Sequence, residues 1–165
     1  MISHVTVRIQ IGGEIKEFAQ EDIIQATLIE CVPVIAVELP ASTFEFQIHT
    51  TLEEFSMFGG DYFESLSRRA PIYLYETLHG VEVFLGKFYL DEWENVDEST
   101  FSFRAVDLVG VLEKLDFDGR FFELPTPLPA VIDEIFSSQG FDIQIDPVLA
   151  DSTISGWIPP CTRRE

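Results

Sequence analysis

The sequence has 165 residues, 46% of them hydrophobic, with 15 phenylalanines, which suits one ordinary domain or one domain plus the start of another. The formal net charge of -19 repels phosphate backbones and anionic lipid, and therefore excludes ordinary nucleic-acid binding and adsorption to a membrane surface. Solubility is a simpler explanation for the same charge. The N-terminus lacks the pattern of a signal peptide, and no apolar run is long enough to span a bilayer, so neither export nor membrane insertion is predicted.

The first 18 residues predict a hairpin. Residues 4–11 alternate between apolar and polar side chains, which is the period of a half-buried strand. Gly12 and Gly13 follow, and both can take the positive φ that a two-residue hairpin turn requires. A phosphate-binding loop is the alternative for a Gly-Gly pair, but it needs a helix after it, and a strand is expected here.

Residues 23–39 are apolar almost throughout, and Pro33 cannot donate to a sheet, so two strands interrupted at Val32-Pro33 are expected. Residues 44–48 alternate again and predict a further half-buried strand. His49 falls on its polar face, where Glu45 is the one potential co-ligand, so a solvated histidine is favoured over a metal ligand. Cys31 and Cys161 lack CxxC spacing and indicate neither a zinc site nor a disulfide framework.

A short helix is predicted at about 61–68. Asp61 and Glu64 have the spacing of a capping box, and Pro71 ends the segment. The pair Arg68-Arg69 stands at the end of this helix, where it complements the helix dipole. Phosphate binding is the alternative function for this pair, and the dipole interpretation is favoured over it.

Residues 71–115 predict three antiparallel strands and a closing helix. A turn at His79-Gly80 joins the first two strands, and a polar turn at 95–99 leads into the third strand at 101–105. From Asp107 the apolar residues change to helical spacing behind an acidic N-cap, which predicts a helix at about 107–115.

The residues that most resemble an active site surround Trp93. A glycosidase needs two carboxylates about 5 to 9 Å apart that face one cleft. Asp91 and Glu92 point to opposite faces as strand neighbours, whereas Glu92 and Glu94 share a face but stand at a strand end. A catalytic pair is therefore disfavoured, and no catalytic residue is assigned. Residues 116–119, DFDG, match only half of a calcium loop, and a turn is predicted instead.

Beyond Gly119 a second module of α+β type is expected at 120–165. Thr126 is predicted as the N-cap of a helix, with Pro127 at its first position and Gly140 after its end. Residues 141–145 then alternate as a strand. Residues 162–165, TRRE, fit a capping box, so a helix is expected to begin there and the module to be truncated at its C-terminus.

Three segments resemble a known family. These are GKFYLDEWENVDESTFSFRAVDLVGVLEK at 86–114, ELPASTFEFQI at 38–48 and ISGWIPPCTRRE at 154–165. Together they resemble the baseplate-hub (tail-associated) proteins of siphophages and Gram-positive prophages. The resemblance implies a mainly β fold with minor α, in which an antiparallel β-barrel over 1–115 precedes the start of a small α+β module over 120–165.

The resemblance also implies a function. Such proteins form a ring of three copies at the distal end of the tail tube, hold the spike or fibre, and contact other tail proteins. It implies a virion protein made in the bacterial host cytoplasm, with no enzymatic activity, cofactor or metal site. Acidic side chains are then expected to line the inner surface of the ring, where repulsion keeps DNA from binding.

Two other function classes stay open. A carbohydrate-binding β-domain would use aromatic side chains as stacking platforms, although core packing explains most of them equally well. A glycosidase would use Glu92 and Glu94. The aromatic candidates are Trp93, Tyr73, Tyr75 and Trp157.

Overall fold

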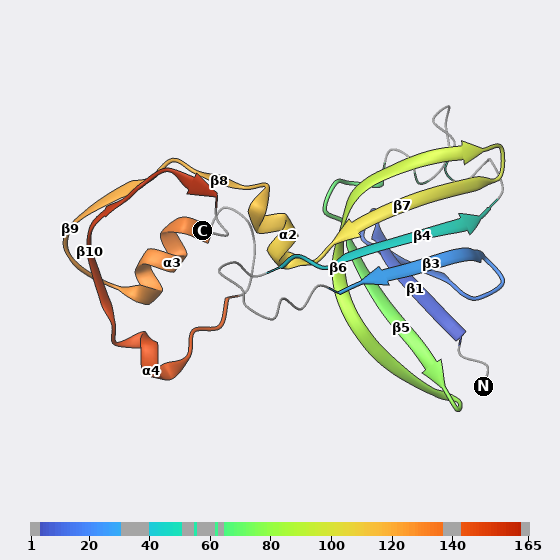
Figure 1. The fold of residues 1–165 in the computed structure, drawn as a ribbon, viewed down its shortest axis with the longest axis horizontal. Coiled ribbons are helices and arrows are strands. Elements are labelled where there is room, and N and C mark those ends of the chain that lie inside the picture. Colours follow the sequence, from blue (N-terminus) through green and yellow to red (C-terminus); the bar gives the residue numbers. More distant parts are fainter. Residues whose placement is uncertain are drawn as a thin grey trace. The chain divides into compact units, whose positions relative to one another are not determined.

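The structure is a computed structural model that describes residues 4–30, 40–50, 55, 62, 65–136 and 143–162 (Figure 1). The chain divides into two compact units, Met1–Val111 and Leu112–Glu165. Both units contain antiparallel strands, and the mainly β fold with few helices that the sequence predicts for the chain is confirmed.

The first unit is a single seven-stranded antiparallel sheet with the order β2-β1-β5-β6-β7-β4-β3. Three hairpins build most of it, and β1 lies against β5 while β4 lies against β7. The sheet is strongly curved in Figure 1. Its strands are β1 (His4–Ile11), β2 (Glu14–Phe18), β3 (Ile23–Ile29), β4 (Thr43–His49), β5 (Pro71–Leu78), β6 (Val81–Asp97) and β7 (Thr100–Val106).

The concave face of this sheet holds the core. Because side chains alternate along a strand, every second residue of β1, β4, β5 and β7 points inward. Phe46 lies at the centre, with ring centroids 5.1 Å from Phe44 and 5.0 Å from Phe103. All three rings are 1% exposed, and burial of each such side chain contributes about 1.5–3 kcal/mol. The inward faces predicted for 4–11, 44–48 and 101–105 are confirmed.

The two edge strands of the sheet are consecutive in sequence. Only residues 19–22 connect β2 to β3, and a tight turn forms there because Ile23 N donates to Ala19 O over 3.2 Å. Among the described residues, no hydrogen-bonded pairing joins β2 to β3. The sheet is therefore open along this seam, and closure into a barrel is not observed.

Two predicted hairpin turns are confirmed. Gly12 and Gly13 have φ of 57° and 94° between β1 and β2. His79 and Gly80 have φ of 53° and 79° between β5 and β6. Both turns have the left-handed backbone that suits the twist of a two-residue hairpin. The next turn is tighter than predicted, since strand pairing continues to Asp97 and only residues 98–99 form the turn.

The longest strand, β6, belongs to two pairings. Its first half pairs with β5 and its second half with β7, and Tyr89 is opposite both Pro71 and Val106. Irregularities in register interrupt both ladders, at Leu74/Tyr75 and at Leu90/Glu92, and such bulges bend a strand and increase its twist.

The predicted helix after β7 is observed as α2 (Leu108–Glu113). Asp107 fixes its start, because one carboxylate oxygen accepts from Gly110 N over 2.9 Å and the other accepts from Ser42 N over 2.8 Å. The acidic N-cap is therefore confirmed, and it also ties the helix to the segment that precedes β4.

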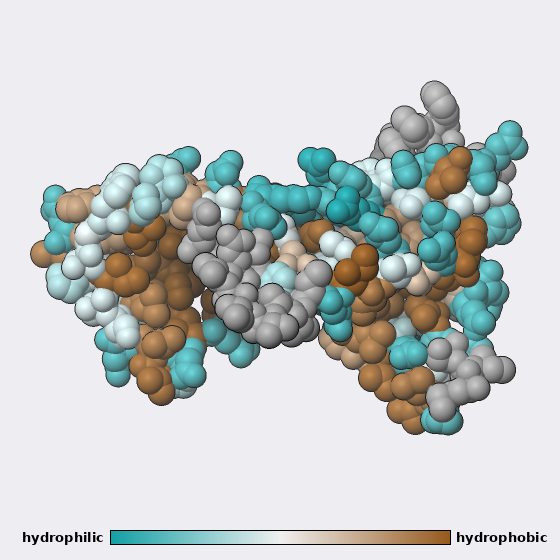
Figure 2. Space-filling model, in the orientation of Figure 1, coloured by the Kyte–Doolittle hydropathy of each residue, from teal (hydrophilic) through white to brown (hydrophobic). Residues whose placement is uncertain are grey.

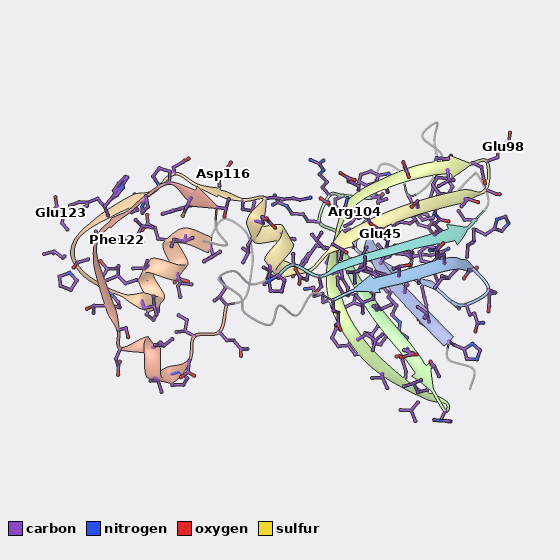
Figure 3. The ribbon with its side chains drawn as sticks, viewed as in Figure 1. Glu45, Glu98, Arg104, Asp116, Phe122 and Glu123 are labelled. Carbon is purple, nitrogen blue, oxygen red and sulfur yellow. The ribbon has the colours of Figure 1, made fainter. Side chains whose placement is uncertain are left out.

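The second unit consists of two short ribbons and two helices. Its ribbons pair β9 with β10 and β8 with β11, and β9 and β10 arch around α3 in Figure 1. Phe122 points to the inside of the ribbon and Glu123 away from it (Figure 3). The elements are β8 (Asp116–Phe117), β9 (Arg120–Pro127), α3 (Leu128–Phe136), α4 (Pro147–Ala150), β10 (Thr153–Ile158) and β11 (Cys161–Thr162).

Several local predictions for this unit are wrong. Thr126 is not an N-cap, because it lies in β9 and its hydroxyl donates to Leu124 O over 3.0 Å. Residues 143–145 are irregular instead of forming a strand. Thr162 is paired with Asp116 in β11 and does not begin a helix. Gly140 and residues 163–165 lie outside the described residues.

The helix predicted at 61–68 and the strand break at Val32-Pro33 fall largely on residues that are not described. Tyr62 and Ser65 are in turns, and Leu66 and Ser67 are not helical. Arg68 and Arg69 lie in a turn, with φ of 66° at Arg69. A helix end at this pair, the basis of the dipole interpretation, is therefore not observed.

Candidate functional site

A depression in the described part of the first unit has a volume of about 430 Å³. It lies over β4, β6 and β7 and opens widely to solvent. A smaller depression of about 50 Å³ adjoins it through Glu45 and Ser102 and extends to β3. The larger one is lined by Glu45, Glu92, Trp93, Glu94, Ser102, Phe103 and Arg104.

The strand register explains why these side chains meet. Glu92 lies opposite Arg104 and Glu94 opposite Ser102, on the convex face of the sheet. Trp93, opposite Phe103, therefore has its ring on the other face, where it packs against the core. The sequence prediction that Glu92 and Glu94 share a face is confirmed.

One ion pair crosses the depression. Arg104 Nε lies 3.6 Å from Glu45 Oε1, and both side chains are about half exposed, at 50% and 53%. Figure 3 labels the two side chains where β4 and β7 run side by side. Three carboxylates and one guanidinium leave a local charge of -2, and ion pairs this exposed are weak because water screens them.

The depression is an open surface of the sheet and not an enclosed pocket. The carboxylates stand on an open sheet surface, without the apolar enclosure that keeps a glycosidase acid protonated. In the described part of the chain, no group of three or more His, Cys, Asp or Glu could hold a metal ion. His49 is exposed on the polar face of β4, as predicted.

A second cluster on the convex face joins β1, β2 and β6. Arg8 Nε donates to Glu17 Oε2 over 2.6 Å, and its terminal nitrogens donate to Glu82 over 2.9 and 3.1 Å. The guanidinium carbon lies 4.3 Å from the centroid of the Tyr75 ring. The hydrogen bonds that Arg8 donates, to Glu17 foremost and then to Glu82, raise the pKa of Arg8 above its ordinary value. Sequence reasoning missed this cluster because its residues come from separate strands.

The aromatic side chains that were predicted to stack on sugars differ in their surroundings. Tyr75 is half-buried between Arg8 and Phe84, and Tyr73 lies beneath Lys87 with 5.7 Å between the ammonium and the ring centroid. Trp157 in the second unit is 58% exposed, and it lies directly across the ribbon from Phe121, which is 57% exposed.

The other residues that the sequence analysis considered, in the DFDG turn and at the two cysteines, do not form a binding site in the described part of the chain. Gly119 of the predicted DFDG turn has φ of 83°, and its Cα is packed so closely that a Cβ would lie 2.8 Å from Ile158 O. Cys161 is a half-buried free thiol in β11, and Cys31 lies outside the described residues. Within the described ranges, no helix has the length and apolar character needed to cross a membrane.

Comparison with known proteins gives similarity in structure only. No protein-family model matches the sequence, and no curated protein matches it. A chain of the Francisella PdpA–VgrG complex, in its half-lidded form, matches 97% of this chain with a TM-score of 0.50 and 12% identity. The prophage MuSo2 43 kDa tail protein of Shewanella oneidensis matches 91% of it with a TM-score of 0.42 and 15% identity.

This chain spans 25% of the matched chain of the complex and 43% of the MuSo2 tail protein. Structural neighbours of the chain are thus a prophage tail protein and the PdpA–VgrG complex, and its fold is shared with a chain of that complex over nearly its whole length.

Proposed function

We propose that this chain is a structural component of a phage or prophage tail tip or baseplate hub. In this proposal, it assembles into a trimeric ring at the distal end of the tail tube and holds the spike or fibre. The observation that carries the proposal is the fold shared with a chain of the PdpA–VgrG complex over 97% of this chain. The role is non-enzymatic and its partners are other tail proteins.

The sheet itself supports an assembly role. Its concave face is filled by its own core, and its convex face carries exposed carboxylates above β4, β6 and β7. We propose that the unit works as an open barrel, in which β2 and β3 do not pair with each other within one chain. The acidic face then turns toward the lumen of the ring, where like charge keeps DNA from adhering.

Immunoelectron microscopy tests the tail role. In a host that carries the gene, antibody against this chain should label the distal tip of released tail particles. A deletion of the gene should yield particles without spike or fibre, and complementation should restore them. Labelling along the whole tube, or normal tips in the deletion strain, would contradict the proposal.

A carbohydrate-binding function has one observation in its favour. Trp157 and Phe121 are exposed opposite each other on the β9–β10 ribbon, and exposed aromatic rings stack on sugar faces. Titration with cell-wall saccharides, followed by tryptophan fluorescence, tests this function. Saturable quenching that Trp157→Ala abolishes would favour it over assembly alone, and a flat titration would remove it.

A further inference from the structure

The first half of β6 has a free edge. Residues Val81–Tyr89 pair with β5 on one side, but β7 pairs with β6 only from Tyr89 onward. Among the described residues, no strand covers the other side of Val81–Phe88. Part of the N–H and C=O groups of this segment therefore point to an unoccupied edge, which is a template for another strand.

Exposed apolar side chains accompany this edge. Val81, Val83, Phe84 and Leu85 are 63%, 40%, 54% and 41% exposed. Figure 2 shows hydrophobic side chains gathered over the end of the β5–β6 hairpin. Edge strands of monomeric proteins are usually protected by charge, proline or short length. Val81–Phe88 has no proline, and its two charged residues, Glu82 and Lys87, stand among exposed apolar side chains.

The strand β3, which stands at one end of the sheet order, provides a second free edge. Its seven residues, Ile23–Ile29, include no charged side chain. Ile24 and Ile29 are 55% and 48% exposed. Ala26 lies opposite Phe46 on the core face and is nevertheless exposed, so the sheet is open beside β3.

The charges near the β3 and β6 edges indicate which partner would pair with them. A chain with net charge of -19 repels its own copies wherever acidic surface meets acidic surface. The β3 edge is uncharged, and in Val81–Phe88 the single acid Glu82 is bound by Arg8 and balanced by Lys87. A basic partner would be drawn to the acidic convex face instead, so these two edges suit a second copy of the same chain.

We propose that β3 of one copy pairs with Val81–Phe88 of β6 in the next copy, which continues the sheet from subunit to subunit. The segments match in length, at seven and eight residues, or about 23 Å of strand. Because the two surfaces differ, the contact is heterologous and closes into a ring when the rotation allows. This inference rests on the proposed ring assembly and names its contact surfaces.

Two single substitutions test the pairing. Ile24→Lys places a charge on the β3 edge, and Val83→Lys places one on the β6 edge; both side chains are already exposed, so folding should persist and circular dichroism checks it. Each variant should lose about tenfold or more in the self-association constant by sedimentation velocity. Val148→Lys is the matched control, since Val148 is 84% exposed on α4, and it should associate like the unmodified chain.

Mixing the two variants gives the decisive result. Each retains the edge that the other lacks, so an equimolar mixture should form dimers and no larger ring. Amide hydrogen exchange should show that the amides of 23–29 and 81–88 that face away from β4 and β5 gain protection as the protein concentration rises, whereas the amides already paired with β4 and β5 are protected at every concentration.

Three results would overturn the inference. If the chain is a monomer at all concentrations, or if it assembles equally well with both substitutions, the named edges do not pair. If Val83→Lys abolishes association while Ile24→Lys does not, the contact joins two β6 edges instead. The labelling of tail tips is independent of all three results, so failure of this inference is distinguishable from failure of the proposed function.

Discussion

Gly110 is the glycine with the least room for a side chain in the described part of the first unit. A Cβ at this position would lie 2.8 Å from Val106 Cβ and 3.3 Å from Ala41 Cβ. Both neighbours are first side-chain atoms, which no rotamer change can move. The start of α2 therefore approaches the end of β7 as closely as it does because this residue has no side chain.

Gly110→Ala should lower the free energy of unfolding by up to about 2 kcal/mol. Alanine gains about 1 kcal/mol of helix propensity, but overpacking against fixed atoms costs about 1–3 kcal/mol, and the clash is expected to prevail. Urea denaturation followed by tryptophan fluorescence measures the change. A variant as stable as the original chain would show that β7 and α2 can separate without cost.

Asp97 gives the β6–β7 turn a dependence on pH. Its Oδ1 accepts from Ser99 N over 2.9 Å and from Ser99 Oγ over 3.3 Å. These hydrogen bonds, the backbone one foremost, lower the pKa of Asp97 below its ordinary value of 3.8. Because the folded-state pKa is the lower one, the stabilisation is complete above 3.8 and is lost as the pH falls through the folded value.

An NMR titration should place the midpoint of Asp97 below 3.8. Asp97→Ala should remove this titration and the protection of the Ser99 amide from exchange. Glu98→Ala, one position along in the same turn, is the control and should leave the Ser99 amide unchanged. A midpoint at or above 3.8 would mean that the turn does not hold the carboxylate in solution.

For single residues, the sequence predicted those features that depend on the conformation of the residue's own backbone. Gly12, Gly13 and His79-Gly80 were predictable because their turn conformations depend on local sterics. The position of Thr126 was not predictable, because its hydroxyl is able either to cap a helix or to donate within its own strand. The pairing of Thr126 with β10 selects the second arrangement. The cluster around Arg8 depends on strand pairing that no local pattern encodes.

Among the elements of the first unit, β1, β2 and β6 are linked on the convex face by one side chain. Arg8 binds Glu17 and Glu82 and covers the Tyr75 ring, with its own side chain 27% exposed. Several charge-assisted bonds on one partly shielded guanidinium are worth more than an isolated surface ion pair.

Arg8→Ala should therefore cost about 1–2 kcal/mol of stability. Arg8→Lys should recover only part of this, since an ammonium cannot bind Glu82 through two nitrogens while it stacks on Tyr75. Arg104→Ala is the matched control, because its single ion pair of 3.6 Å is half exposed, and it should cost less than about 0.5 kcal/mol. Thermal unfolding compares the three, and equal losses for both arginines would contradict the cooperative contact.

The longer elements of the fold were predictable because their period is sustained. Both main hairpins, the strand at 43–49 and the helix after Asp107 follow from alternation and turn chemistry. The short elements were not, because β8 and β11 are two residues each and exist through their pairing with each other. Residues 143–145 alternate in sequence but are irregular, since a strand needs a partner as well as a pattern.

For the whole molecule, the net charge of -19 determines how the self-association of the chain responds to salt. Like charges on two copies repel over roughly 10 Å at 0.1 M ionic strength and over less at higher salt. The proposed contact between β3 and β6 is uncharged or balanced, so salt should not weaken it.

Self-association should therefore strengthen as sodium chloride rises from low to moderate concentration. Sedimentation velocity across a salt series measures this dependence. The Val83→Lys variant is the control and should stay largely monomeric throughout. Dissociation of the unmodified chain by added salt would mean that ion pairs, and not apolar strand edges, hold the copies together.

The architecture as a whole could be predicted only in part. A mainly antiparallel β fold was evident from aromatic and β-branched alternation, but the strand order places β5 beside β1 and β7 beside β4, across long stretches of chain. Local periodicity contains no information about such pairings. The same limit applies to the acidic depression, whose Glu45 comes from a strand distant in sequence from Glu92 and Glu94.

Because β6 pairs with β5 on one side and with β7 on the other, there are few places where this chain can gain or lose a residue. Tyr89 aligns with Pro71 on one flank and with Val106 on the other. One inserted residue near it would turn every following side chain to the opposite surface, bringing glutamates inside and Trp93 out to water. Length variation among natural variants should thus collect at the His79-Gly80 and Glu98-Ser99 loops and avoid the strand between them.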